Sequence, residues 1–267
     1  MNHLLREFAP ISDTAWAALD REAKDRLVPA LAARRLVDFH GPSGWEHSAV
    51  NLGRVTDIDE PFFGLQALQR KVQPLVEVRA SFALSRTELA DFDRGATDID
   101  VATLDDACMR VATAENLAVF HGWPTAGITG LVAGTFPALP LSAEFTGYPG
   151  DVARAVETLR QAGITGPYGL ALGPDAYTGA VVQSEGGGVI VFDHLRKILD
   201  GPVVSAPGLS GAVVVSLRGG DFTFHSGEDL AIGYHHHDAD TVHLYLEESF
   251  TFVISTGEAA VALGPAS

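Results

Sequence analysis

The chain has 267 residues, of which 46% are hydrophobic, and its formal net charge is −16. This composition predicts a globular protein with an ample core, built as one large domain or two lobes. The acidic balance argues against nonspecific nucleic-acid binding, and no apolar run approaches the roughly 18–20 residues of a membrane helix. The start MNHLLREFAP lacks the apolar stretch of a signal peptide, and the single cysteine cannot form an internal disulfide, so we expect a cytoplasmic protein.

The first predicted element is a helix that begins after Ser12, a plausible N-cap. Its apolar residues recur at helical spacing, at Trp16, Leu19, Ala23, Leu27 and Leu31. Pro29 is expected to kink or end this helix, because its ring blocks a backbone hydrogen bond.

The next segment has little to form a core. Residues 49–56 have an extended pattern, residues 57–72 form a polar, charged connection, and residues 76–82 alternate between apolar and polar side chains. We interpret this segment as a long two-stranded arm. Because an isolated hairpin is marginal in water, its own domain or a neighbouring subunit must cover it.

Two helices are predicted after the arm. Ser85-Arg86-Thr87-Glu88 has the pattern of a capping box before a short helix, and Thr103 begins a longer helix that ends near residue 122. Cys108 lies in the apolar pattern of the longer helix, which favours a buried, reduced thiol over a nucleophile. A Gly- and Pro-rich link over residues 122–141 suggests a lobe boundary.

The following part alternates helices and strands. Helices are predicted at 151–162, from Pro174 onward and at 190–199, and strands at 168–172, in "VVSAP" and in "GAVVVSLR". Gly186-Gly187-Gly188 predicts a flexible loop. Arg218-Gly219-Gly220-Asp221 predicts a two-residue hairpin turn into the strand "FTFHS".

Three consecutive histidines, His235 to His237, precede an acidic turn and a long strand. The strand buries one side, at Val242, Leu244, Leu246, Phe250, Phe252 and Ile254, and Glu248 is the one interruption of this apolar face. A metal site would need His235, His237 and a carboxylate to converge. We favour a solvated polar loop that leads into the strand, with incidental metal binding by the histidine run left open.

Signatures of common enzymes are missing from the sequence. It contains no G-x-S-x-G, P-loop, G-x-G-x-x-G or H-E-x-x-H motif and no paired cysteines. We therefore predict no catalytic residues, no cofactor and no metal site.

Six blocks occur in an order that resembles one family. They are "FAPISDTAWAALDREA", "ARRLVDFHGPSGWE", "SFALSRTELADFDRG", "GPYGLAL", "VVVSLRGGDF" and "DLAIGY...DTVHLYLEESFTF". Together they resemble encapsulin (family 1), the nanocompartment shell protein once called a linocin-type bacteriocin, from roughly residue 4 to 263. In that family the histidine run falls in a variable loop, so the resemblance gives a metal site no support.

The resemblance implies an α+β fold, that of the tailed-phage major capsid protein (Hong Kong 97 type). It implies a peripheral lobe, an extended arm and an axial lobe. By position, the peripheral lobe comprises residues 1–48, 80–131 and 226–267, the arm residues 49–79, and the axial lobe residues 132–225.

The resemblance also implies a function. Encapsulins are homo-oligomers that close into hollow icosahedral shells, which by symmetry need at least about sixty copies. They enclose cargo enzymes of the peroxidase or ferritin-like class, which carry a C-terminal targeting peptide that docks on the inner wall. No nucleic acid, membrane or cofactor takes part.

Two sites are carried over by position. The implied cargo-peptide groove comprises Leu27, Leu31, Arg34, Asp38, Asp229 and Ile232, where an apolar groove flanked by charges can hold an extended peptide. Core packing for the two leucines, and an Arg34–Asp38 pair, remain alternatives. The implied pore loop, at a fivefold axis, comprises Glu185, Gly186, Gly187 and Gly188.

Other classes of protein remain open at this point. One is a phage capsid, since the fold is shared, although a strongly acidic subunit suits packaged DNA less well. The other is a bacteriocin or peptidase, which no catalytic constellation in the sequence supports. The sequence names neither the cargo nor the number of subunits in a shell.

Overall fold

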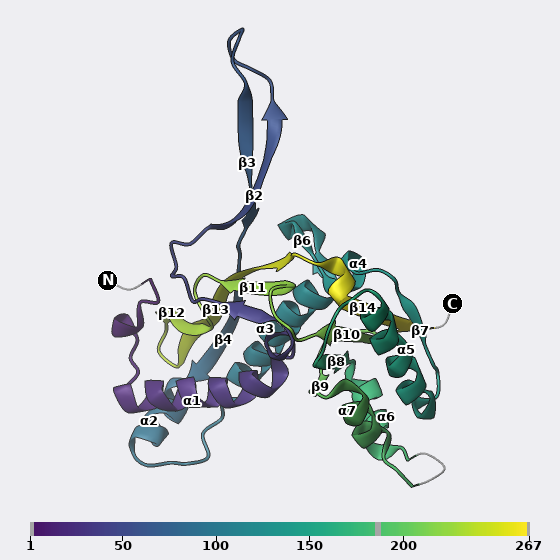
Figure 1. Cartoon of the computed structure of the whole chain (residues 1–267). Helices are drawn as coiled ribbons and strands as arrows, with labels where there is room; N and C mark the ends of the chain where they lie inside the picture. The colour runs from purple at the N-terminus through teal and green to yellow at the C-terminus, as the bar shows by residue number, and fades with distance from the viewer. Residues whose placement is uncertain (1–2, 185–187, 266–267) are drawn as a thin grey trace.

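The computed structural model describes residues 3–184 and 188–265. The helices in these ranges are α1 (Asp13–Ala30), α2 (Arg86–Asp93), α3 (Ala102–Phe120), α4 (Leu131–Gly134), α5 (Tyr148–Gln161), α6 (Pro174–Val182) and α7 (Val191–Leu199). The strands are β1 (Asp38–His40), β2 (Ala49–Ile58), β3 (Ala67–Pro74), β4 (Val76–Ser85), β5 (Gly122–Trp123), β6 (Ile128–Thr129), β7 (Leu139–Leu141), β8 (Tyr168–Leu172), β9 (Val203–Ser205), β10 (Ala212–Ser216), β11 (Phe222–Ser226), β12 (Ala231–His237), β13 (Thr241–Ile254) and β14 (Ala260–Pro265). Figure 1 shows two packed bodies and one projecting arm.

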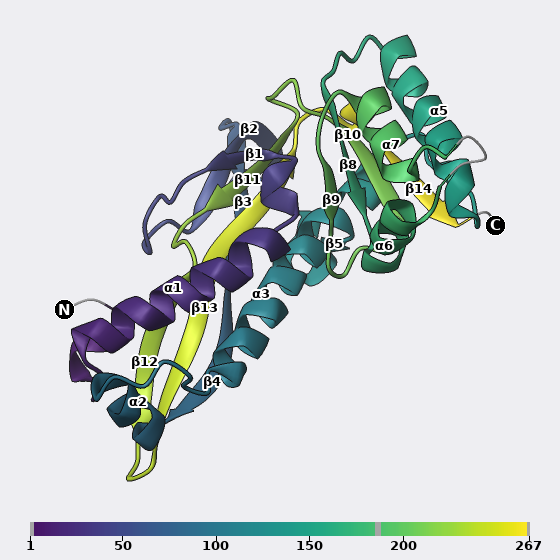
Figure 2. The same ribbon diagram turned by 90° about the horizontal axis from the view of Figure 1, so that it is seen from below.

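The first sheet has the long strand β13 at its centre. Its order is β1-β11-β13-β12, and β4 also pairs with β13. Helices α1 and α3 lie side by side across this sheet (Figure 2). Leu19, Leu104 and Leu244, from α1, α3 and β13, belong to one buried cluster, so the apolar stripes of both helices pack on the sheet.

Helix α1 confirms the N-terminal prediction. The Ser12 hydroxyl accepts a hydrogen bond from the backbone N–H of Ala15, as an N-cap does. The helix ends at Ala30, one residue after Pro29, and the backbone N–H of Leu31 donates to the carbonyl of Leu27. The end of the helix and the start of β12 line one cavity, in which the candidate groove forms.

The arm differs from the prediction. Its second strand is β3, which pairs with β2, so the prediction of a connection over residues 57–72 was wrong. Residues 76–82, predicted as the returning strand, belong to β4 and pair with β13. Apolar and polar residues alternate in β4 because one face of this strand, with Ala80, Phe82 and Leu84, is buried in the core of the first sheet. β3 has no such alternation because both its faces are exposed.

The second sheet has the order β7-β14-β10-β8-β9 and is packed with α5, α6 and α7. Every residue of β8 and β10 is buried. The hairpin predicted at Arg218–Asp221 was wrong, because β11 belongs to the first sheet. Gly219 and Gly220 do adopt positive φ, but β8 and β14 already occupy both edges of β10.

Strand pairing departs from the predicted lobe boundaries at two places. Residues 222–225 of β11 were assigned to the axial lobe, yet they pair with β1 and β13. The C-terminal β14 was assigned to the peripheral lobe, yet it pairs with β7 and β10 in the second sheet. The chain therefore passes from the second sheet to the first after β10, and back to the second sheet after β13. A single boundary at residue 225 does not describe these two crossings.

Candidate functional site

A cavity of about 520 Å³ lies between the second half of α1 and the start of β12. It is lined by Arg6, Asp20, Ala23, Lys24, Leu27, Val28, Leu31, Arg34, Asp229, Leu230, Ala231, Ile232 and Leu246. Five of the six residues predicted for the cargo groove are therefore brought to one place. We call this cavity the α1 groove.

The middle of the α1 groove is apolar. Leu27, Leu31 and Ile232 line it and are largely buried, since they also belong to the core between α1 and the first sheet. Core packing of the two leucines is therefore confirmed, and both also line the groove, while their role in docking stays a prediction. Val28, which the sequence reasoning missed, is 58% exposed at the rim. Its position next to Leu27, on the second half of the predicted helix, could have indicated that Val28 lines the groove.

One end of the groove is built around Arg34. Its Nη1 donates to Asp229 at 2.7 Å, its Nε to Glu115 at 2.8 Å and its Nη2 to Glu248 at 2.9 Å. The guanidinium also lies over the ring of Phe39, 5.0 Å from its centroid. Burial alone would lower the pKa of Arg34, but the three carboxylates raise it above its ordinary value, so its charge is permanent.

Two carboxylic acids under Arg34 are almost fully buried. Burial raises the pKa of Glu115 and of Glu248, and the nearby Glu115 raises that of Glu248 further. With Glu248 protonated and Glu115 ionised, the two carboxyl groups no longer repel each other, and the negative charge of Glu115 faces the positive charge of Arg34. The sequence carried a signal for Glu248, which interrupts the apolar face of its strand, and for Glu115, four residues after Val111 in the apolar pattern of α3.

The other end of the groove carries a second set of charges. Arg6 forms a two-point ion pair with Asp20, and its guanidinium lies 4.1 Å from the ring centroid of Trp16. Lys24 lines the same end. The sequence reasoning missed these residues, because Arg6 reaches the groove from a short segment before α1 that no pattern marked. The groove is thus apolar in its middle and charged at both ends.

Asp38 lies apart from this groove. It belongs to β1, and its carboxylate accepts a hydrogen bond of 2.6 Å from the backbone N–H of Gly220. The alternative of an Arg34–Asp38 pair is also not formed, since Arg34 pairs with Glu115, Asp229 and Glu248. Alternation along the strand turns Asp38 toward a different, smaller cavity next to Arg35.

The predicted pore loop falls mostly outside the described residues, which exclude Glu185, Gly186 and Gly187. Gly188 is described and has a φ of +79°, a conformation that suits glycine. Ser184 and Ile190 form an isolated antiparallel bridge on either side of the loop, between α6 and α7. Its place at a pore stays a prediction.

The histidine run lies in a strand, so the prediction of a polar loop was wrong. β12 extends through His237, and His236 pairs with His243 on β13. Their rings stack with centroids 4.2 Å apart, and Nδ1 of His237 is 2.6 Å from the hydroxyl of Tyr234. Across residues 3–184 and 188–265, no group of three or more His, Cys, Asp or Glu could hold a metal ion.

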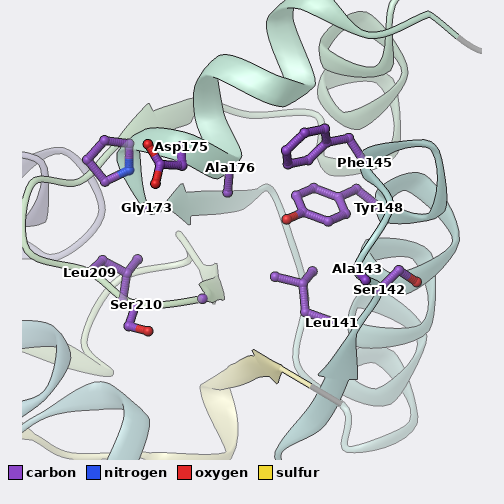
Figure 3. A pocket seen from close by; sticks show the side chains of 12 residues that line it. Leu141, Ser142, Ala143, Phe145, Tyr148, Gly173, Asp175, Ala176, Leu209 and Ser210 are labelled. Atoms are coloured by element: carbon purple, nitrogen blue, oxygen red, sulfur yellow. The ribbon is translucent and has the colours of Figure 1, made fainter.

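A second cavity, of about 540 Å³, lies beside the second sheet (Figure 3). Phe145 and Tyr148 meet edge to face along one wall, and Asp175 is the one charged residue among the described residues that line the cavity. A lone carboxylate does not form the nucleophile–base arrangement of covalent catalysis. Cys108 is buried elsewhere, as predicted, and burial raises the pKa of its thiol to about 11, so it is unreactive at neutral pH.

Comparison with solved structures shows the fold class. The fold matches the virus-like particle from Pyrococcus furiosus with a TM-score of 0.65 and 17% identity, over 93% of this chain and 98% of that one. It matches the capsid of an empty GTA particle with a TM-score of 0.56 and 15% identity, over 89% and 90% of the two chains. The predicted α+β capsid-type fold is therefore confirmed.

Sequence comparison narrows the class to a family. The chain belongs to the Linocin_M18 family, described as encapsulating protein for peroxidase, which it matches over residues 1–251. It is 45% identical to a type 1 encapsulin shell protein of Rhodospirillum rubrum, over 98% of this chain and 96% of the relative. Relatives of the same name from Rhodococcus erythropolis and Mycobacterium tuberculosis are 43% and 40% identical, over 98% of this chain and 100% and 99% of their own lengths.

These comparisons confirm the predicted family and the prediction of a structural shell component in place of an enzyme. No helix in the described part of the chain is long and apolar enough to cross a membrane.

Proposed function

We propose that copies of this chain close into a hollow icosahedral shell in the cytoplasm. The shell encloses a cargo enzyme of the peroxidase or ferritin-like class, whose C-terminal targeting peptide docks in the α1 groove. The observation that carries the docking proposal is the convergence of Leu27, Leu31, Arg34, Asp229 and Ile232 on one cavity. The family description, an encapsulating protein for peroxidase, supports the cargo class.

The arm supports assembly. Among the strands of the described residues, β2 and β3 pair only with each other, and they project from the body (Figure 1). Large apolar side chains are exposed along the arm, at Val55, Ile58, Phe62, Phe63, Leu65, Leu68 and Val72. A two-stranded hairpin with this much exposed apolar surface needs cover in water, and within the described chain nothing provides it. Neighbouring copies in a closed shell supply that cover.

The α1 groove suits an extended apolar peptide. Leu27, Leu31 and Ile232 offer apolar contact, and each Å² of apolar surface that a peptide buries contributes about 25 cal/mol. The ion pairs at both ends fix where the apolar stretch stops, because an apolar side chain placed on them would break hydrogen-bonded charges. The groove therefore selects a short apolar segment with polar residues on both sides.

A rim substitution tests docking without disturbing the core. Val28→Asp places a charge at the groove, where a docked peptide would bury it at a cost of several kcal/mol. We expect a co-expressed fluorescent reporter that carries the cargo's C-terminal peptide to be lost from purified shells, by at least about tenfold. The matched control is Met109→Asp on α3, which is exposed to a similar degree and lies outside the groove.

Particle size is measured on the same samples by electron microscopy. Intact, empty Val28→Asp shells beside loaded Met109→Asp shells would support the groove. Full loading of the Val28→Asp shells would remove docking from this groove. Leu31→Asp serves as a second variant, and loss of its shells would show that the core contacts of Leu31 dominate.

A further inference from the structure

The strand that lines the α1 groove forms an edge of the first sheet. Among the strands of the described residues, β12 pairs with β13 alone, so its other edge is open (Figure 2). The backbone N–H of Tyr234 points outward at this edge, because it donates to the carbonyl of Leu4 at 2.8 Å. Backbone groups two residues apart in a strand point the same way, so those of Ile232 also point outward.

The outward N–H and C=O of Ile232 have no hydrogen-bond partner within residues 3–184 and 188–265. Ile232 is nevertheless buried, with 3% of its surface exposed. Buried backbone groups are nearly always paired, so these two groups point to a ligand that supplies the missing hydrogen bonds. Ile232 lines the α1 groove, which places such a ligand in this groove.

The free part of the edge is short. On one side, the carbonyl of Leu4 already accepts from the N–H of Tyr234. On the other side, the N–H of Leu230 donates to the carboxylate of Asp229 at 2.9 Å. The free edge is therefore confined to Ile232, where an extended segment can form one pair of main-chain hydrogen bonds.

We propose that the cargo's C-terminal peptide docks as an added strand on this free edge, with its terminal carboxylate toward Lys24. This inference rests on the proposed function, from which it takes the occupant of the α1 groove. One carbonyl of the peptide accepts from the N–H of Ile232, and one N–H of the peptide donates to the carbonyl of Ile232. In this mode of recognition, main-chain bonds supply affinity and pockets for alternate side chains supply specificity.

The groove offers such pockets on one face of the sheet. Ile232 of β12, Leu246 of β13 and Leu27 of α1 belong to one buried cluster, and all three line the groove. Side chains alternate across a strand, so every second residue of the peptide points toward α1. The groove therefore selects a peptide with apolar residues at positions i and i+2.

Charge complementarity gives the peptide its direction. Arg6 and Arg34, at the two ends of the groove, are already paired with carboxylates of the chain. Lys24 lines the same end as Arg6, and in the part of the chain that the structure describes it forms no ion pair. A peptide that ends in a carboxylate complements this cation, so its terminus lies at the Lys24 end.

Hydrogen exchange at single-residue resolution tests strand addition on assembled shells of the full chain. The shells are co-expressed with the fluorescent reporter that carries the cargo's C-terminal peptide, or with the reporter that lacks it. We expect the amide of Ile232 to exchange at least about tenfold more slowly in occupied subunits, whose fraction is measured by reporter fluorescence. The amide of Tyr234, bonded to Leu4 in both samples, is the internal control.

A substitution scan of the reporter's peptide tests the alternation. Aspartate placed at each position in turn should abolish loading at positions i and i+2 and spare the position between them. Any other pattern would overturn the added strand, and losses at i, i+3 and i+4 would identify a helical peptide in its place.

The variant Lys24→Gln tests the direction. We expect its shells to hold about two- to fivefold less reporter, because an exposed ion pair is lost. Arg21→Gln, at an exposed position of α1 outside the groove, is the matched control. Equal loading of the two variants would overturn the contact between Lys24 and the terminal carboxylate.

The exchange experiment also separates this inference from the proposed function. A reporter that loads while the amide of Ile232 exchanges as fast as in empty shells would overturn the added strand and leave docking in the α1 groove standing. A reporter that never loads would overturn the proposed docking and this inference with it. An Ile232 amide as protected as that of Tyr234 in empty shells would show that the edge is not free, and would also refute the added strand.

Discussion

At the scale of single residues, the charges under the α1 groove combine one arginine with three carboxylates. Arg34 contacts Glu115, Glu248 and Asp229, and the first two carboxylates are almost fully buried. Full ionisation would leave two uncompensated negative charges beside an apolar cavity, which burial strongly disfavours. A proton held by Glu248 reduces this excess, and Arg34 keeps hydrogen-bonding partners on three sides.

This arrangement predicts a pH-dependent effect of Glu248→Gln. Because the pKa of Glu248 is raised in the folded protein, its contribution to stability is fully present below about pH 4.5 and is lost as the pH rises through its folded value. Glutamine resembles the protonated acid and never ionises. We expect the variant to unfold at a higher temperature than the unaltered chain at pH 8, with the advantage shrinking at pH 5.

Thermal unfolding of both proteins at the two pH values measures this effect. Glu77→Gln, on an exposed carboxylate paired with Arg79, is the control and should show no such difference. A Glu248→Gln variant that is less stable than the unaltered chain at pH 8 would show that Arg34 requires an ionised Glu248. This result would contradict a protonated Glu248.

At the scale of elements, the arm lacks cover within the described chain, whereas the two sheets are covered. β2 and β3 bury almost nothing within the chain, whereas β8, β10 and β13 are covered on both faces. In the proposed shell, assembly would therefore stabilise the arm, whereas the sheets are stabilised by the folding of the single chain.

Changes at the tip of the arm should separate assembly from folding. Phe62 and Phe63 are 74% and 91% exposed, so Phe62→Ser/Phe63→Ser removes little buried surface within the chain. We expect unchanged secondary structure by circular dichroism and loss of large particles in gel filtration. Val182→Ser, at a position 78% exposed outside the arm, is the control and should assemble normally. Full-size particles from the double variant would show that the tip makes no essential contact.

At the scale of the whole molecule, one chain is an incomplete structure. Two sheets, joined by a buried cluster that includes Phe224 and Phe250 of the first sheet, carry an arm that lies over neither of them (Figures 1 and 2). The chain shares this arrangement with solved capsid-type particles. The net charge of −16 also favours repulsion between subunits, so apolar contacts through the arm have to outweigh it.

The purified protein should therefore elute as a very large particle, because closed assembly is the state in which the arms are covered. Negative-stain images should show hollow spheres of uniform size. A stable monomer in ordinary buffer would contradict the shell, whatever the fold.

Some features of the structure could be predicted from the sequence because they depend on local chemistry. The Ser12 cap, the end of α1 after Pro29 and the start of α6 at Pro174 each depend on neighbours in the chain, and the structure confirms them. The long strand β13 is also confirmed, but the prediction of a single buried side was wrong, because Tyr245, Glu247 and Thr251 on the other face are buried as well. The five groove residues were carried over from the family resemblance, and the structure brings them to one cavity.

Pairing between distant segments was decided by the tertiary structure alone. Residues 76–82 alternate as any half-buried strand does, and only β13 made them part of the first sheet and left β3 to the arm. The turn at Gly219-Gly220 had hairpin chemistry, but its flanking strands joined different sheets because β8 and β14 already occupied both edges of β10. Glu115 and Glu248 each stood out in an apolar pattern, and only the fold brought Arg34 to them. Periodicity reports that a face is buried, whereas the partner that buries it is set by contacts between residues far apart in the chain.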